Sequence, residues 1–155
     1  MRKSVLIVYT LSVNAQRLYY LNRLLLYYMS ALNLFMKKIL VVDDKPSMSQ
    51  LMVRFLQTSF EVTTKNDGLQ AISWLQSGNI PDIILTDLQM PNMDGIELIK
   101  RIKESGYFND IPIIVLSSQE SSNVRVECLK LGAEDYIMKP FNPEELMIRI
   151  ERLIK

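Results

Sequence analysis

The sequence contains no histidine and only one cysteine, Cys128. Without histidine, Ser-His-Asp and Cys-His catalysis are excluded, so any chemistry must rest on carboxylates, hydroxyls and lysines. A single cysteine cannot form a disulfide within the chain, which fits a reducing compartment such as the cytoplasm. The chain also lacks a strongly basic region, because residues 36–155 carry 14 basic and 17 acidic side chains, a net charge of −3. We therefore expect no nucleic-acid-binding face.

Residues 1–35 lack aspartate, glutamate, glycine and proline, yet hold five of the seven tyrosines. A signal peptide has some support from Arg2-Lys3 and the apolar run Val5 to Val13. A membrane span is less well supported, because polar residues interrupt the run of about 18 apolar residues that a span needs. An amphipathic surface helix over Leu18 to Phe35 is a third interpretation. We prefer a fourth, in which Met36 is the natural start and the earlier residues are translated upstream sequence or a poorly ordered tail.

From Met36 onward, short apolar runs alternate with stretches of helical periodicity. Each run is too short for a helix and predicts a strand. Strands this apolar must be covered on both faces, so five βα units predict an α/β fold, a flavodoxin-like doubly wound parallel sheet with strand order 2-1-3-4-5. The predicted strands are Ile39–Val42, Phe60–Thr64, Ile83–Thr86, Ile111–Leu116 and Asp135–Met138.

The spacing of apolar residues and the residues typical of helix ends both support helices between the predicted strands. Apolar residues spaced three and four apart predict one buried helical face over Met48, Leu51, Met52, Phe55 and Leu56. The predicted N-caps are Asp67, Asp94 and Asn142. The fourth helix is expected to begin near Ser121 and the fifth near Pro143. Glycines are predicted to follow three helix ends, at Gly78, Gly106 and Gly132.

Charged and hydroxyl side chains stand directly after four of the predicted strands. Asp43 and Asp44 follow the first, Asp87 the third, Ser117 the fourth and Lys139 the fifth. These four strands are neighbours in the order 2-1-3-4-5, and open α/β sheets bind ligands at the carboxyl ends of their strands. Each residue alone has an ordinary interpretation as a cap, a turn or a solvated strand end. Their joint occurrence predicts a single site.

Three clustered carboxylates require a cation, because each pair at ~4 Å repels by on the order of 4 kcal/mol at an effective dielectric constant of about 20. Carboxylate oxygens without histidine or thiolate suit a hard ion such as Mg²⁺. Lys139 adds a positive charge from the opposite side, and Ser117 adds a hydroxyl donor. This set of groups fits the transfer of a phosphoryl group to Asp87.

The candidate site residues lie in four separated motifs. They are Val41-Val42-Asp43-Asp44, Thr86-Asp87-Leu88-Gln89-Met90-Pro91-Asn92-Met93-Asp94-Gly95, Leu116-Ser117-Ser118 and Gly132-Ala133-Glu134-Asp135-Tyr136-Ile137-Met138-Lys139-Pro140-Phe141. In sequence, order and spacing these motifs resemble the receiver domain of two-component response regulators. The resemblance covers Met36 to Lys155 and predicts a receiver domain over residues 36–155, preceded by an extension over residues 1–35 that it does not cover.

The resemblance implies that Asp87 is the phosphoacceptor, supplied by a histidine kinase or a histidine phosphotransfer protein. It also implies a Mg²⁺ ion held by Asp43, Asp44, Asp87 and the backbone carbonyl of Gln89. Lys139 is then expected to pair with the phosphoryl oxygens, and the peptide bond after Lys139 is expected to be cis.

The resemblance further implies a switch. Ser117 is expected to move toward the phosphoryl group and Tyr136 to rotate into the vacated space, although a static, half-buried Tyr136 is an alternative. In receivers, the positions that Gln89 and Gln119 occupy influence how long the phosphoryl group survives. A downstream target protein is expected to bind the face formed by the helix near Ser121, the strand Asp135–Met138 and the last helix, and phosphorylation-dependent dimerisation stays open.

We therefore expect a stand-alone, cytoplasmic response regulator that works as a phosphorylation-controlled protein-interaction switch. Its own chemistry would be limited to phosphotransfer to Asp87 and loss of that group, with no direct nucleic-acid binding and no membrane insertion of the main domain. One alternative is a Mg²⁺-dependent phosphohydrolase, but Gln89 stands where such enzymes carry a second carboxylate. The other is a phosphorylation-independent adaptor, against which the intact set of site residues argues.

Overall fold

The computed structural model of the protein describes residues 20–25 and 36–154. The chain divides into two compact units, Met1–Met36 and Lys37–Lys155. In the first unit, residues 20–25 are helical. The signal-peptide, membrane-span, surface-helix and tail interpretations of residues 1–35 otherwise concern positions outside the described residues. No helix among those described is long and apolar enough to cross a membrane.

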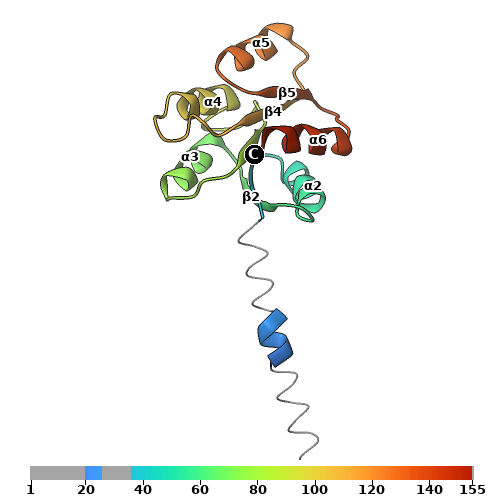
Figure 1. The fold of residues 1–155 in the computed structure, drawn as a ribbon. Helices are drawn as coiled ribbons and strands as arrows, with labels where there is room; N and C mark the ends of the chain where they lie inside the picture. Colours follow the sequence, from blue (N-terminus) through green and yellow to red (C-terminus); the bar gives the residue numbers. More distant parts are fainter. Residues whose placement is uncertain (1–19, 26–35, 155) are drawn as a thin grey trace, which may run out of the picture. The chain divides into compact units, whose positions relative to one another are not determined.

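The second unit is built on a five-stranded parallel sheet with the order β2-β1-β3-β4-β5 (Figure 1). This order confirms the predicted flavodoxin-like topology. Two predicted strands match the structure at both ends, and the other three differ by one or two residues at one or both ends. The strands are β1 (Lys38–Val42), β2 (Glu61–Lys65), β3 (Ile83–Thr86), β4 (Ile113–Ser117) and β5 (Asp135–Met138).

Helices cover both faces of the sheet because the side chains of the central strands alternate between two apolar cores. In β1, Leu40 and Val42 belong to one core, and Ile39 and Val41 belong to the other. The first core is closed by α3 (Gly68–Gln76), α4 (Gly95–Lys103) and α5 (Ser122–Lys130), and the second by α2 (Pro46–Leu56) and α6 (Pro143–Leu153) (Figure 1).

The helix ends follow the predicted capping chemistry. The carboxylate of Asp67 accepts a hydrogen bond from the Gln70 backbone N–H, Asp94 accepts one from Glu97, and the side chain of Asn142 accepts one from Glu144. Gly78 and Gly132 follow α3 and α5 with φ of 93° and 108°, a conformation that favours glycine. These caps fix where the helices begin, and so where the loops after β2, β3 and β5 turn.

One side chain differs from the sequence-based expectation. The apolar pattern places Leu51 on the buried face of α2, but its side chain is 52% exposed, because the apolar stripe of this helix is narrower than the five-residue pattern indicates. Gly106 follows the end of α4, as predicted, and stands three residues beyond its last residue.

Cys128 is fully buried, and burial raises the pKa of its thiol.

Candidate functional site

The sheet brings the predicted site residues together at the carboxyl ends of its strands. Asp43 and Asp44 follow β1, Asp87 follows β3, and Lys139 follows β5. The Asp87 backbone N–H donates to the Val42 carbonyl at 2.8 Å, so the end of β3 is fastened directly to the end of β1. The crossover topology therefore places Asp43 and Asp87 side by side, although they are 44 positions apart in the chain.

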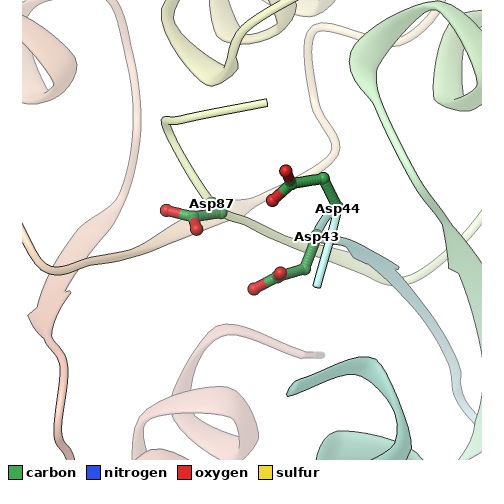
Figure 2. Close-up of side chains that lie close together, drawn as sticks. All are labelled: Asp43, Asp44 and Asp87. Atoms are coloured by element: carbon green, nitrogen blue, oxygen red, sulfur yellow. The ribbon is translucent and has the colours of Figure 1, made fainter. Parts of the chain in front are cut away.

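Three carboxylates form a cluster at this edge (Figure 2). One oxygen from each of Asp43, Asp44 and Asp87 lies within 4.8 Å of the others. Asp43 is 3% exposed and Asp87 is 4% exposed, so neither charge is well solvated. Asp44 Oδ1 is buried and has no hydrogen-bond partner among the described residues. Such an oxygen is suited to coordinate a cation, and the donor set, all carboxylate oxygen, fits a hard divalent ion.

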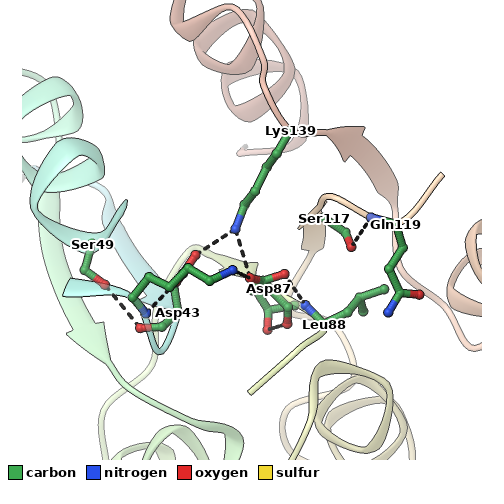
Figure 3. A network of polar contacts seen from close by, with 9 residues as sticks. Asp43, Ser49, Asp87, Leu88, Ser117, Gln119 and Lys139 are labelled. Atoms are coloured by element: carbon green, nitrogen blue, oxygen red, sulfur yellow. Dashed lines mark hydrogen bonds and ion pairs between the residues drawn. The ribbon is translucent and has the colours of Figure 1, made fainter. Parts of the chain in front are cut away.

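A buried ammonium group sits between two of these carboxylates (Figure 3). Lys139 Nζ lies 2.8 Å from Asp43 Oδ2 and 3.1 Å from Asp87 Oδ2, and its side chain is only 7% exposed. The other oxygen of each carboxylate is held by the backbone, since Asp87 Oδ1 accepts from the Leu88 N–H at 2.7 Å and Asp43 Oδ1 from the Lys45 N–H at 2.8 Å. The Oδ2 atoms of Asp43 and Asp87 are thereby both turned toward the Lys139 ammonium group.

A second lysine reaches the same carboxylate. Lys45 Nζ lies 3.7 Å from Asp87 Oδ2, and its side chain is 55% exposed. The cluster therefore combines three carboxylates with two ammonium groups of very different burial. A carboxylate oxygen flanked by positive charge is an arrangement that can accept and stabilise a phosphoryl group.

Comparison with known proteins assigns the family. The response regulator receiver domain model matches residues 39–151. The chain belongs to the response regulator receiver domain family.

Relatives of this receiver domain occur in larger signalling proteins. It is 37% identical over 119 residues to the response regulator MprA of Mycobacterium sp. (strain KMS), covering 76% of this chain and 50% of MprA. It is 36% identical over 129 residues to the hybrid signal transduction histidine kinase D of Dictyostelium discoideum, covering 83% of this chain and 8% of that kinase. The chain thus matches half or less of the length of these curated relatives.

A solved structure supports the same assignment. The chemotaxis response regulator CheY4 of Vibrio cholerae matches with a TM-score of 0.70 and 34% identity, covering 76% of this chain and 98% of CheY4. The match confirms the receiver fold and its strand order.

The two predicted switch residues meet at the backbone of Gln119. Ser117 ends β4, is fully buried, and its hydroxyl accepts a hydrogen bond from the Gln119 N–H at 3.1 Å (Figure 3). The Tyr136 hydroxyl donates to the Gln119 carbonyl at 2.9 Å, and the ring is 8% exposed. Tyr136 is therefore buried rather than half-buried. Motion of Ser117 or Tyr136 stays a prediction, and Gln119 is the residue that links them.

Two predicted features near the receiver pocket have different outcomes. The Lys139-Pro140 peptide bond is cis, as expected. Gln89 is exposed in the loop directly after Asp87, and the role of its carbonyl as a metal ligand stays a prediction.

The loop after Asp87 is held by the neighbouring loop after β2. Asn92 adopts a left-handed conformation with φ of 61° and its side-chain amide donates to Asp67 Oδ2 at 2.9 Å. The Gly68 backbone N–H donates to the Met93 carbonyl at 3.1 Å. Asp67 thus caps α3 and orders the loop after Asp87 with the same carboxylate.

Asp67→Ala is expected to lower the free energy of unfolding at pH 7 by about 1–2 kcal/mol, the usual cost of losing a cap. Burial acts to raise the pKa of the Asp67 carboxyl, but hydrogen bonds from the Gln70 backbone and the Asn92 amide outweigh it and lower the pKa. The charged form therefore adds stability that is present above the unfolded pKa, near 3.8, and is lost as the pH falls through the lower folded pKa. Urea unfolding across pH 3–7 measures this.

The matched control is Asp110→Ala, which removes an exposed carboxylate. Its effect is expected to stay within about 0.5 kcal/mol. A loss for Asp67→Ala that is the same at pH 3 and pH 7 would contradict a charge-dependent role.

Sequence reasoning missed three residues that shape the site. The sequence does not single out Lys45, because a lysine in a polar loop is normally solvated. Ser49 is buried and its hydroxyl donates to the Asp43 carbonyl at 3.3 Å. Asn92 lies within one of the four motifs, but nothing in the sequence indicates its contact with Asp67. Only Lys45 carried a signal, its position beside two predicted metal ligands.

Proposed function

We propose that this receiver is a phosphorylation-controlled switch in a two-component phosphorelay, with Asp87 as the phosphoacceptor. The observation that carries the proposal is the contact of Asp87 Oδ2 with the buried Lys139 ammonium at 3.1 Å. In the transfer, a carboxylate oxygen of Asp87 attacks the phosphorus of a phosphohistidine, the P–N bond breaks, and the imidazole leaves with a proton. Lys139 then faces the charge that the phosphoryl oxygens bring into the pocket.

A Mg²⁺ ion fits the three carboxylates and the unpartnered Asp44 Oδ1. Asp43, Asp44 and Asp87 would hold it, with the Gln89 carbonyl as a further ligand. When bound, the ion neutralises charge on the phosphoryl oxygens during transfer. The protein's own contribution is to orient Asp87 through the Leu88 N–H and to keep Lys139 fixed beside it.

The proposed donor is a histidine kinase or a histidine phosphotransfer protein, and the proposed output is binding to a target protein. The face formed by α5, β5 and α6 supports this output, since Val126 and Leu129 on α5 and Ile148 on α6 are apolar and between 44% and 58% exposed. Phosphorylation-dependent dimerisation through this face is a second form of the same output. We place the switch in the cytoplasm and propose that this receiver does not bind nucleic acid directly.

We further propose that the receiver is not an enzyme acting on other substrates. Its chemistry would be limited to phosphotransfer to Asp87 and hydrolysis of that acyl phosphate. Two residues after the nucleophile the chain carries the exposed amide Gln89 rather than a carboxyl, so no general acid stands at that position for turnover of phosphomonoesters.

The test is incubation of the full chain with phosphoramidate, with MgCl₂ or with EDTA, followed by intact-mass measurement. We expect a single phosphoryl adduct that requires Mg²⁺ and is absent in Asp87→Asn. Asp82→Asn is the matched control, because Asp82 is also an aspartate beside β3 but pairs with Lys37, away from the pocket. It is expected to be phosphorylated like the wild type.

Other outcomes would redirect the assignment. A folded wild-type chain that forms no adduct would favour the phosphorylation-independent adaptor. Sustained release of phosphate from small phosphomonoesters would favour the phosphohydrolase instead.

A further inference from the structure

Lys45 is built into the edge of the acidic pocket. Its backbone N–H donates to Asp43 Oδ1 at 2.8 Å, and it is the residue directly before Pro46, which begins α2. The start of the side chain is therefore fixed beside the cluster, while the ammonium group reaches Asp87 Oδ2 at 3.7 Å. With 55% of the side chain exposed, the ammonium retains a direct path to solvent.

The charge balance of the pocket depends on this residue. Three carboxylates and two ammonium groups leave a formal net charge of −1. Without Lys45, Lys139 alone would leave −2, the charge that one divalent cation neutralises. Lys45 therefore weakens the attraction of the pocket for a divalent ion.

We propose that Lys45 is an internal counter-cation that competes with the divalent ion for the pocket and sets its affinity. This inference rests on the proposed Mg²⁺ site. Of the two lysines, Lys45 is the one that the ion displaces. Lys139 is 7% exposed and contacts two carboxylates, whereas Lys45 contacts one and can swing into water. A bound ion would thus replace the contact of Asp87 with Lys45. The contact of Asp87 with Lys139 would remain, and Lys139 would stay available for the phosphoryl group.

The competition also has a use in the switch. A pocket that keeps its carboxylates partly neutralised in the absence of the ion avoids the full repulsion between Asp43, Asp44 and Asp87. The divalent ion then binds only when its concentration is high enough to displace the lysine. Lys45 is accordingly an electrostatic competitor of the ion and not a group that reacts.

The test is a titration of the ¹⁵N-labelled full chain with MgCl₂ at constant ionic strength, following the backbone amide shifts of Asp44 and Leu88. Lys45→Gln keeps a polar, unbranched stem that is one atom shorter and removes the charge, and it is expected to bind Mg²⁺ about two- to fivefold more tightly than the wild type. Lys45→Arg keeps the charge and is expected to stay near the wild-type affinity. The difference between Lys45→Gln and wild type is expected to shrink in 1 M NaCl, because salt screens an exposed charge.

The matched control is Lys130→Gln, which removes the same charge from an exposed position on α5. It is expected to leave Mg²⁺ affinity unchanged. Equal Mg²⁺ affinity for wild type and Lys45→Gln, or equal tightening in Lys130→Gln, would overturn the role of Lys45 while leaving the Mg²⁺ site standing. Absence of saturable shifts in both wild type and Lys45→Gln would overturn the Mg²⁺ site, and this inference with it.

Discussion

Gly95→Ala is expected to lower the free energy of unfolding by about 2–3 kcal/mol, because the new methyl group has no space. A Cβ at this position would collide with the carbonyl oxygen of Asp87 and lie 2.8 Å from the Cα of Leu88. Both are backbone atoms, so no side chain can move aside to relieve the overlap. The Gly95 N–H also donates to the Leu88 carbonyl at 2.9 Å, which holds the two segments together. Urea unfolding at pH 7 measures the loss.

The matched control is Gly106→Ala. A Cβ at Gly106 would meet no heavy atom within 4 Å, and the residue is exposed. This variant is expected to be neutral or slightly more stable, since alanine restricts the unfolded chain more than glycine does. Equal stability of the two variants would contradict a steric role for Gly95.

The same substitution reports on the proposed phosphoacceptor. Because α4 begins at Gly95 and packs against the backbone of Asp87 and Leu88, any shift that accommodates the methyl group must move the loop that begins at Asp87. We therefore expect the phosphoryl adduct of a folded Gly95→Ala chain to form more slowly than that of Gly106→Ala, as followed by intact mass.

Gly95 illustrates what the sequence predicts and what it does not. The pair Asp94-Gly95 predicted a cap and a turn from local chemistry, and the Asp94 cap is confirmed. The need for glycine arises from a contact with a strand end that local patterns do not encode. Periodicity likewise predicted five strands and their order, because short apolar runs separated by helical spacing leave few packing solutions.

The candidate site shows the same division. The sequence identifies Asp43, Asp44, Asp87, Ser117 and Lys139 because each ends a strand or lies within two residues of a strand end, and the topology collects such residues. Lys45 and Gln119 could not be assigned in this way. The reach of Lys45 depends on a rotamer, and the link of Gln119 to Ser117 and Tyr136 runs through its backbone, to which any residue type would contribute.

Lys139→Met is expected to lower the free energy of unfolding in EDTA by about 3–5 kcal/mol, the cost of leaving buried charges without their partner. Lys139 Nζ lies 2.8 Å from Asp43 Oδ2 and 3.1 Å from Asp87 Oδ2, and all three side chains are less than 10% exposed. Methionine keeps the volume of the stem but leaves the two carboxylates facing each other. Urea unfolding in EDTA gives the loss, and added MgCl₂ is expected to restore part of it because the ion binds the folded state.

A control and a double substitution separate charge from packing. Lys37→Met removes an exposed lysine that lies 3.0 Å from Asp82, and its cost is expected to stay below about 1 kcal/mol because surface ion pairs contribute little. Adding Asp87→Asn to Lys139→Met removes one of the facing charges, so the double variant is expected to regain part of the lost stability. A Lys139→Met chain that loses no more than Lys37→Met and gains nothing from Asp87→Asn would show that the ammonium does not hold these carboxylates together. The expected outcome instead ties the stability of the receiver to the same contact that prepares Asp87 for the phosphoryl group.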